Sequence, residues 1–338
     1  ADGTLDMATN DPVATIGGDV LIQSQGSVSG SSGTFSVGGD WTATGTFTHG
    51  NGTVTFNGSV ADATQTVDPG SSSFYKLTIA NTGTGTAKVA LADDATVTNI
   101  FLVQSGTFDL GGHTVAGTTF NQTGGTVIGT GGGTITVSGA ITGTSTLGTW
   151  GEGTTLLINN TAATQVWTGG GVHWNDVEIA KGTQIIDCSG VVQVDGDLKL
   201  TSGRFANDTI SVAGNLEIGD GWYVSSLAYG TVVLNGTDPD PENPQTIEAT
   251  GTGAGYIANL TINKPSGEAK LIGDHTITLS GADTSQGTFT MTKGTLDLNN
   301  RTLDAQIYTH VDGTIKNGTI TASGHVTGTA GTWENGTL

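Results

Sequence analysis

The chain repeats itself, and this internal repetition constrains its fold more than any other feature. A strand-like segment has three copies: GTVTFNG from Gly52, GTTLLINN from Gly153 and GTVVLNG from Gly230. About a dozen residues after each copy stands a glutamine (Gln65, Gln165 or Gln245), and FYKLTI, WNDVEI and IANLTI then follow in the same order. Preserved order over intervals of about 75 to 110 residues predicts a repeat architecture rather than one globular core.

A second repeated element indicates the size of the building unit. Its copies are SGTFDLGGHTV from Ser105, KGTLDLNNRTL from Lys293 and, more loosely, SGRFANDTISV from Ser202. Phe108 lies 29 residues before Val137, whereas the equivalent Phe205 lies only 7 residues before Val212. About 22 residues are absent there and the pattern resumes in phase, which indicates coils that are lost whole. We expect one continuous solenoid over 1–338, with repeat units at about 5–107, 108–204 and 205–295 and a partial unit at 296–338.

The residue types favour strands and tight turns throughout. Glycine (56 residues), Thr, Val and Ile are abundant and good helix formers are rare, and β-branched residues fit a pleated surface better than a helix. With 35% apolar and 12% charged residues the chain does not resemble a disordered protein, and 6 prolines without a three-residue period exclude collagen. The predicted fold class is all-β, a single-stranded parallel β-helix (β-solenoid) with about 20–25 residues per coil.

The alternation of apolar and polar residues predicts which side chains fill the interior. The inward positions are Val54 and Phe56, Leu77 and Ile79, and Leu198 and Leu200. Cys188, the only cysteine, lies in phase with Ile186 and is expected to be a small buried hydrophobic residue, so no disulfide forms within the chain. Gly and Asn supply the left-handed backbone at the corners. A string of β-sandwiches is the rival fold, but losing about 22 residues would remove much of a sandwich core.

The pattern GTVTFNG, QTV, FYKLTI resembles the repeats of large secreted bacterial and archaeal surface proteins with a pectate-lyase-like parallel β-helix. The resemblance covers nearly all of the chain through low-complexity motifs. It implies an extracellular location and an adhesive, scaffold or coat role. No motif of the family's lyases is matched, so no catalytic residue carries over.

Both ends of the sequence lie inside repeats, DGTLDM near the start and GTWENGTL at the end, and neither resembles a cap. Two explanations stay open: the chain is a slice of a longer protein, or copies stack end to end as a homopolymer. The Ala1-Asp2 start also fits a mature chain left after signal-peptide cleavage.

The net charge of −20, from 30 acidic and 10 basic residues, makes nucleic acid and anionic lipid poor partners. No stretch approaches the roughly 20 apolar residues of a membrane span, so membrane insertion is not expected. Polysaccharide stays open as a partner.

Glycan cleavage is the enzymatic alternative for a β-helix, and it needs two suitably spaced carboxylates. Asp93-Asp94 and Asp195 with Asp197 are the closest pairs, but turn formation explains them equally well. The six tryptophans could form a sugar-stacking strip, yet Trp150 and Trp333 occupy the same GTW position, which favours packing. The six histidines form no HxH or HExxH motif. We therefore predict that the chain is not an enzyme.

The segment GTDPDPENPQ breaks the composition of the chain. Asp238, Asp240 and Glu242 alternate with prolines there and could gather on one side of an extended loop as a calcium site, although a solvated loop is the simpler interpretation. No other cofactor is predicted. Ten N-x-S/T sequons are glycosylation candidates if the source organism glycosylates Asn: Asn51, Asn57, Asn121, Asn159, Asn207, Asn235, Asn259, Asn300, Asn317 and Asn335.

The sequence thus predicts an extracellular structural protein that self-assembles into a filament, sheath or surface coat. The alternatives are an adhesin stalk or glycan-binding segment of a larger surface protein and, third, a polysaccharide lyase or hydrolase.

Overall fold

The computed structural model describes residues 3–144, 148–160, 164–222, 230–237, 242–251, 255–280 and 287–338. The chain is an all-β solenoid of about 15 coils of roughly 21 residues, with parallel strands and no helix in the described part. It divides into two compact units, Ala1–Leu157 with Gly170–Asn175, and Ile158–Gly169 with Asp176–Leu338. No helix in the described ranges has the length and apolar character of a membrane span.

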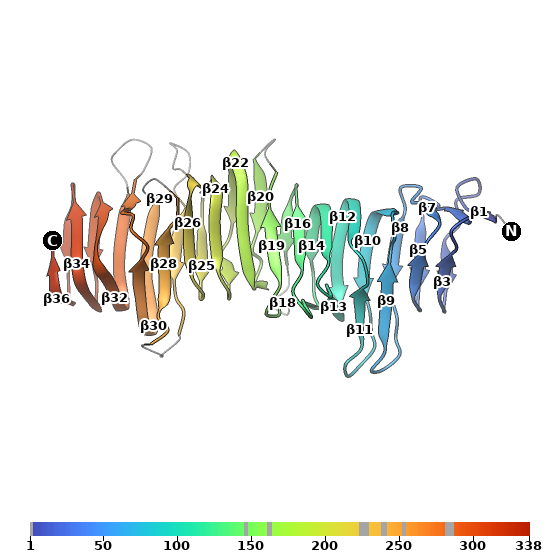
Figure 1. The fold of residues 1–338 in the computed structure, drawn as a ribbon, viewed down its shortest axis with the longest axis horizontal. Helices are drawn as coiled ribbons and strands as arrows, with labels where there is room; N and C mark the ends of the chain where they lie inside the picture. Colours follow the sequence, from blue (N-terminus) through green and yellow to red (C-terminus); the bar gives the residue numbers. More distant parts are fainter. Residues whose placement is uncertain are drawn as a thin grey trace. The chain divides into compact units, whose positions relative to one another are not determined.

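The first unit contains short strands and three long ones that turn a corner (Figure 1). Its strands are β1 (Thr4–Asp6), β2 (Ala14–Ile16), β3 (Val20–Ile22), β4 (Ser27–Ser29), β5 (Thr34–Val37), β6 (Trp41–Ala43), β7 (Thr46–Thr48), β8 (Thr53–Phe56), β9 (Thr64–Asp68), β10 (Ser73–Ala80), β11 (Lys88–Leu91), β12 (Ala95–Ser105), β13 (Thr107–Asp109), β14 (Thr114–Gln122), β15 (Thr126–Ile128), β16 (Thr134–Val137), β17 (Ile141–Gly143), β18 (Thr149–Trp150) and β21 (His173–Trp174), with β19 (Thr155–Ile158) across the unit boundary.

The second unit has more of the long, corner-turning strands. Its strands are β20 (Gln165–Thr168), β22 (Asp176–Ser189), β23 (Val192–Val194), β24 (Leu198–Ala206), β25 (Thr209–Val212), β26 (Leu216–Trp222), β27 (Thr231–Leu234), β28 (Gln245–Ala249), β29 (Gly255–Ile257), β30 (Asn259–Ile272), β31 (Ile277–Leu279), β32 (Thr288–Ala305), β33 (Ile307–His310), β34 (Thr314–Ala322), β35 (Val326–Gly328) and β36 (Thr332–Thr337).

Between the first and last coils, strands pair in parallel with strands of the coils before and after them. Val54 of β8 pairs with Phe35 of β5 and with Leu77 of β10. Between β8 and the paired part of β10 the chain forms β9 and the start of β10, so each coil contributes three strand segments and has three faces. Figure 1 shows β10, β12 and β14 side by side, as their registers require. The predicted parallel stacking and coil size are confirmed.

The interior is apolar and follows the predicted alternation. Val54, Phe56, Leu77, Ile79, Leu198 and Leu200 are all at most 2% exposed, and Cys188 and Ile186 are also buried. Aromatic rings gather within the first unit, where Trp41 makes edge contacts with Phe35, Phe47, Phe56 and Phe74. Because residues two apart on a strand share a face, stacking the coils puts these side chains into continuous columns.

The corners are made by residues that tolerate a left-handed backbone. All nine non-glycine residues with positive φ in the described ranges are Asn or Asp, as expected for chains that must turn without a large Cβ. Corner carboxylates also accept backbone N–H groups from the next coil, and this use accounts for part of the acidic excess. Such pairs are Asp11 with Ser32, Asp19 with Asp40, Asp40 with Thr66, Asp62 with Thr86, Asp94 with Thr114, and Asp197 with Asn215.

Successive copies of the sequence repeat within the second unit occupy different faces. Gln165 of β20 pairs with Ile186 in the second half of β22, whereas β28, which begins at Gln245, pairs with the start of β26. The start of β26 pairs with the start of β24, which pairs with the first half of β22. The length of the sequence repeat is therefore not a whole number of coils, and successive copies of the same motif lie on different faces of the solenoid.

Candidate functional site: buried corner clusters and the open first coil

Only one of the three residues of the predicted calcium site lies in the described part of the chain. Asp238 and Asp240 lie outside the described residues, and Glu242 is exposed. Within the described ranges, no three His, Cys, Asp or Glu side chains are arranged to hold a metal ion.

The acidic pairs considered for glycan cleavage take part in corner structure. Asp94 accepts the Thr114 N–H, and Asp197 accepts the Asn215 N–H while its own N–H is donated to Asp176. Burial, together with the nearby Asp197 charge, raises the pKa of Asp176. These contacts support turn formation as the role of the aspartates.

The tryptophans do not form an exposed strip. Trp41, Trp150, Trp167, Trp174 and Trp222 are all at most 8% exposed, and Trp333 is half-buried against Tyr308. Packing, the interpretation favoured by their shared repeat positions, explains their placement.

The ten sequons are divided by their exposure. Those with exposed asparagines are Asn51, Asn57, Asn159, Asn207, Asn300 and Asn335, and those with half-buried ones are Asn121, Asn235, Asn259 and Asn317. The Asn317 amide donates to Asp297 and the Asn259 amide donates to the Gly230 carbonyl, so a glycan there would displace an existing hydrogen bond. The exposed group is the more accessible to a glycosylating enzyme.

The repeated glutamines form buried polar clusters at the corners, and the sequence patterns did not reveal this role. Gln65 is 5% exposed; its Nε2 donates to the carbonyls of Val37 (2.8 Å) and Gly39, and its Oε1 accepts the Gly58 N–H at 3.1 Å. The glutamine thus bonds to backbone groups of two successive turns, and the Val37 carbonyl also accepts the Asn57 N–H at 3.0 Å. Recurrence of a glutamine among apolar strand residues was the available signal.

In the second unit a buried lysine joins each cluster. Gln245 Nε2 donates to the carbonyls of Val212 (3.0 Å) and Gly214, while Gln245 Oε1 accepts from Lys264 Nζ at 2.8 Å. Lys264 Nζ also donates to the Gly236 carbonyl at 2.9 Å, and the lysine is 0% exposed.

The second lysine cluster has the same form. Lys181, 0% exposed, donates through Nζ to Gln165 Oε1 at 2.9 Å and to the Asn160 carbonyl at 2.7 Å. Both acceptors are neutral, and burial lowers the pKa of Lys181 to about 8. Asn81 follows FYKLTI where Lys181 follows WNDVEI, so the first-unit cluster has an amide in place of the amine. The clusters thus hold a primary amine against a carboxamide in a site closed to water.

A different buried charge stabilises a corner of the first unit. Asp109, with a side chain 2% exposed, accepts from Lys88 Nζ at 2.7 Å and from the N–H and hydroxyl of Thr130. Burial alone would raise the pKa of Asp109, but the hydrogen bonds from Lys88, Thr130 and Gly111 outweigh it and lower the pKa to about 2.

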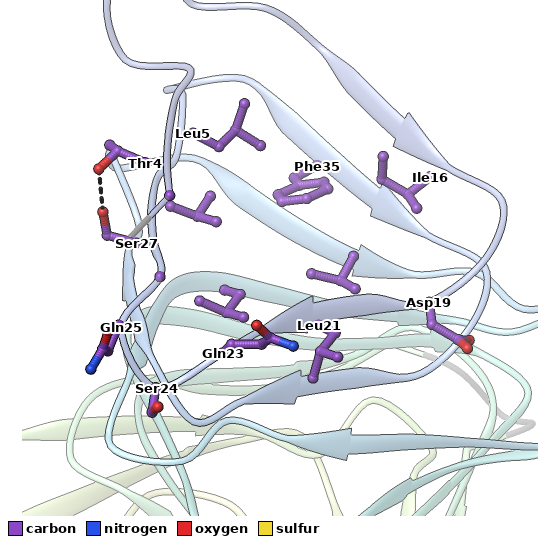
Figure 2. Close-up of a pocket in the computed structure, with 15 residues that line it drawn as sticks. Thr4, Leu5, Ile16, Asp19, Leu21, Gln23, Ser24, Gln25, Ser27 and Phe35 are labelled. Atoms are coloured by element: carbon purple, nitrogen blue, oxygen red, sulfur yellow. Dashed lines mark hydrogen bonds between the residues drawn. The ribbon is translucent and has the colours of Figure 1, made fainter. Parts of the chain in front are cut away.

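The first coil contains an open cavity of about 610 Å³ (Figure 2). Leu5, Ile16 and Phe35 line it together with polar residues such as Gln23 and Ser27. Leu5 is 53% exposed and Ile16 is 37% exposed, although their partners two and one coils later, Phe47 and Val37, are buried. The cavity is therefore the uncovered end of the interior columns.

Comparison of the chain with protein-family models, with curated proteins and with solved structures gave no significant match.

Proposed function

We propose that this chain is an extracellular structural protein whose solenoid coils associate end to end with further copies, building a filament, sheath or surface coat. The observation that carries the proposal is the pair of uncovered coil edges. In the first coil, β1, β2 and β3 pair with β4, β5 and β6 and have no other strand partner among the described residues.

The last described coil also has an uncovered edge. Val326 is 50% exposed, whereas its partner one coil earlier, Tyr308, is 1% exposed. Leu338, which follows the Thr319–Thr337 pair, is 60% exposed, whereas Ile320 is fully buried. An unpaired parallel edge with apolar side chains beside it favours addition of another strand layer.

A joint between two copies would be heterologous, because the first coil of one copy would cover the last coil of the next. A heterologous contact that does not close into a ring propagates as a filament. The resemblance of the repeats to secreted surface proteins with pectate-lyase-like β-helices supports a structural role outside the cell, and the acidic, Thr-rich composition suits a soluble exposed surface.

The purified chain should therefore form rods of increasing length in negative-stain electron microscopy and show concentration-dependent mass in analytical ultracentrifugation. Leu5→Lys with Ile16→Lys should abolish both, because charges would then occupy the uncovered columns. Val166→Lys is the matched control: Val166 is 45% exposed on β20, which belongs to neither terminal coil, so this variant should assemble normally. Monomers of one size at all concentrations would refute self-assembly and assign the open edges to neighbouring coils of a longer surface protein.

A further inference from the structure

The two buried amine–amide clusters of the second unit carry a chemistry that the proposed structural role does not require. Lys264 Nζ lies 2.8 Å from Gln245 Oε1, and Lys181 Nζ lies 2.9 Å from Gln165 Oε1. Adding a carbonyl bond of about 1.23 Å, each amine nitrogen is no more than about 4 Å from the amide carbon Cδ. All four side chains are at most 6% exposed.

We propose that Lys181 with Gln165, and Lys264 with Gln245, are sites of spontaneous isopeptide bond formation that covalently lock the coils at these corners. The Nζ–Cδ bond forms and the Cδ–Nε2 bond breaks. The proton released by the attacking amine passes to the departing nitrogen, which leaves as ammonia. The step consumes no oxidant, reductant or further reactant.

Fixed geometry supplies what an isolated amine and amide lack. A well-oriented intramolecular nucleophile reacts as though present at about 10⁵ to 10⁸ M, which compensates for the low reactivity of a carboxamide. Gln245 Nε2 is already held by the carbonyls of Val212 and Gly214, so the amide cannot rotate away from the amine. Exclusion of water from a fully buried amine also removes the competing hydrolysis.

The attacking amine must be neutral, and the surroundings favour that form. Lys181 donates to two neutral acceptors, the Gln165 amide oxygen and the Asn160 carbonyl. Its pKa, lowered to about 8 by burial, makes a substantial neutral fraction available in mildly alkaline solution.

The first unit provides an internal control. Gln65 occupies the equivalent buried corner, but Asn81 stands at the lysine position and has no nucleophilic amine. A Gln65 crosslink is therefore not expected in the native chain, whereas Asn81→Lys should create a third site.

Peptide mapping by mass spectrometry of the full chain, aged at about pH 9, tests the proposal. We expect two crosslinked peptides, one joining Gln165 to Lys181 and one joining Gln245 to Lys264, each lighter than its components by one ammonia. The linked peptides are the deciding readout, because succinimide formation at Asn-Gly sequences such as Asn51-Gly52 also releases ammonia. Lys181→Arg and Lys264→Arg should each remove only their own linked peptide, and Asn81→Lys should add one.

If the wild-type chain, with circular dichroism confirming its fold, yields only unlinked peptides for both pairs, the proposal is overturned and the clusters are hydrogen-bonded corner structures. The wild-type measurement decides this even if a variant misfolds. It is also independent of end-to-end assembly, since monomers and rods can be mapped separately.

Discussion

Asp109→Asn tests how much one buried corner carboxylate contributes to the solenoid. Lowering the pKa of Asp109 from 3.8 to about 2 corresponds to about 2 kcal/mol, since one unit is about 1.4 kcal/mol. Lys88 is 28% exposed, so solvent screening reduces the expected contribution to about 1 to 2 kcal/mol. The asparagine keeps the size of the side chain and one acceptor oxygen but loses the charge that attracts Lys88.

The sign of the pH dependence follows from the direction of the shift. The folded pKa is below the unfolded value, so the stabilisation is complete above about pH 4 and is lost as the pH falls towards about 2. The wild-type chain should therefore exceed Asp109→Asn in stability at neutral pH, and the difference should vanish near pH 2.

Amide hydrogen exchange is the suitable assay, because a repeat protein can open locally and a global transition would average the effect. Protection of the Thr130 and Gly111 amides, which donate to Asp109, should fall by about 5- to 30-fold in Asp109→Asn at pH 7, the factor for about 1 to 2 kcal/mol. A double-mutant cycle with Lys88→Met isolates the ion pair from other effects of the substitution. Equal protection in wild type and variant at pH 7, or a difference that persists at pH 2, would refute this reasoning.

Three further predictions test the interior and the corners, each measured as a change in local opening free energy by amide hydrogen exchange. Phe101→Ala should cost about 3 to 5 kcal/mol because the ring is fully buried between Phe108 and Phe120, and a cost below about 1 kcal/mol would contradict a close-packed column. Gln65→Leu should cost about 2 to 4 kcal/mol because the Gly39 carbonyl and the Gly58 N–H lose their glutamine partner, while the Val37 carbonyl keeps the Asn57 N–H. The matched control Gln193→Leu, at a half-buried outward position, should cost under about 0.5 kcal/mol, and equal costs would contradict the corner role. Gly190→Ala, at φ +72° with open space around the added Cβ, should cost about 1 to 2 kcal/mol from backbone strain alone. Gly203→Ala, at φ +110°, should cost more because the added Cβ would lie 3.0 Å from Lys181 Cβ. The reverse order of the two costs would contradict the packing of the Gly203 corner.

The sequence predicted the parallel strands, the coil size and the inward side chains because each follows from a local period. Val54 and Phe56 alternate with threonines, and about 22 residues are missing between Phe205 and Val212, as the loss of one coil requires. The Gln65, Gln165 and Gln245 series was visible as a repeat marker, but its chemistry was not. A glutamine's partners at a corner come from the previous coil, 26 and 28 residues away in the case of Gln65, and no local pattern specifies them.

What the sequence determined by itself is therefore the repeating unit: which residues face inward, where the chain turns, and that coils stack in parallel. Only the tertiary structure decided which side chains meet across coils, as Lys88 meets Asp109 and Lys264 meets Gln245. It also decided which apolar side chains stay uncovered, namely Leu5 and Ile16 at the first edge. The physical reason is that burial and hydrogen bonding depend on the coil above and below. Similar local sequences thus acquire different partners and exposure according to the coil in which they lie: Trp150 is 8% exposed, whereas Trp333 of the other GTW copy is half-buried.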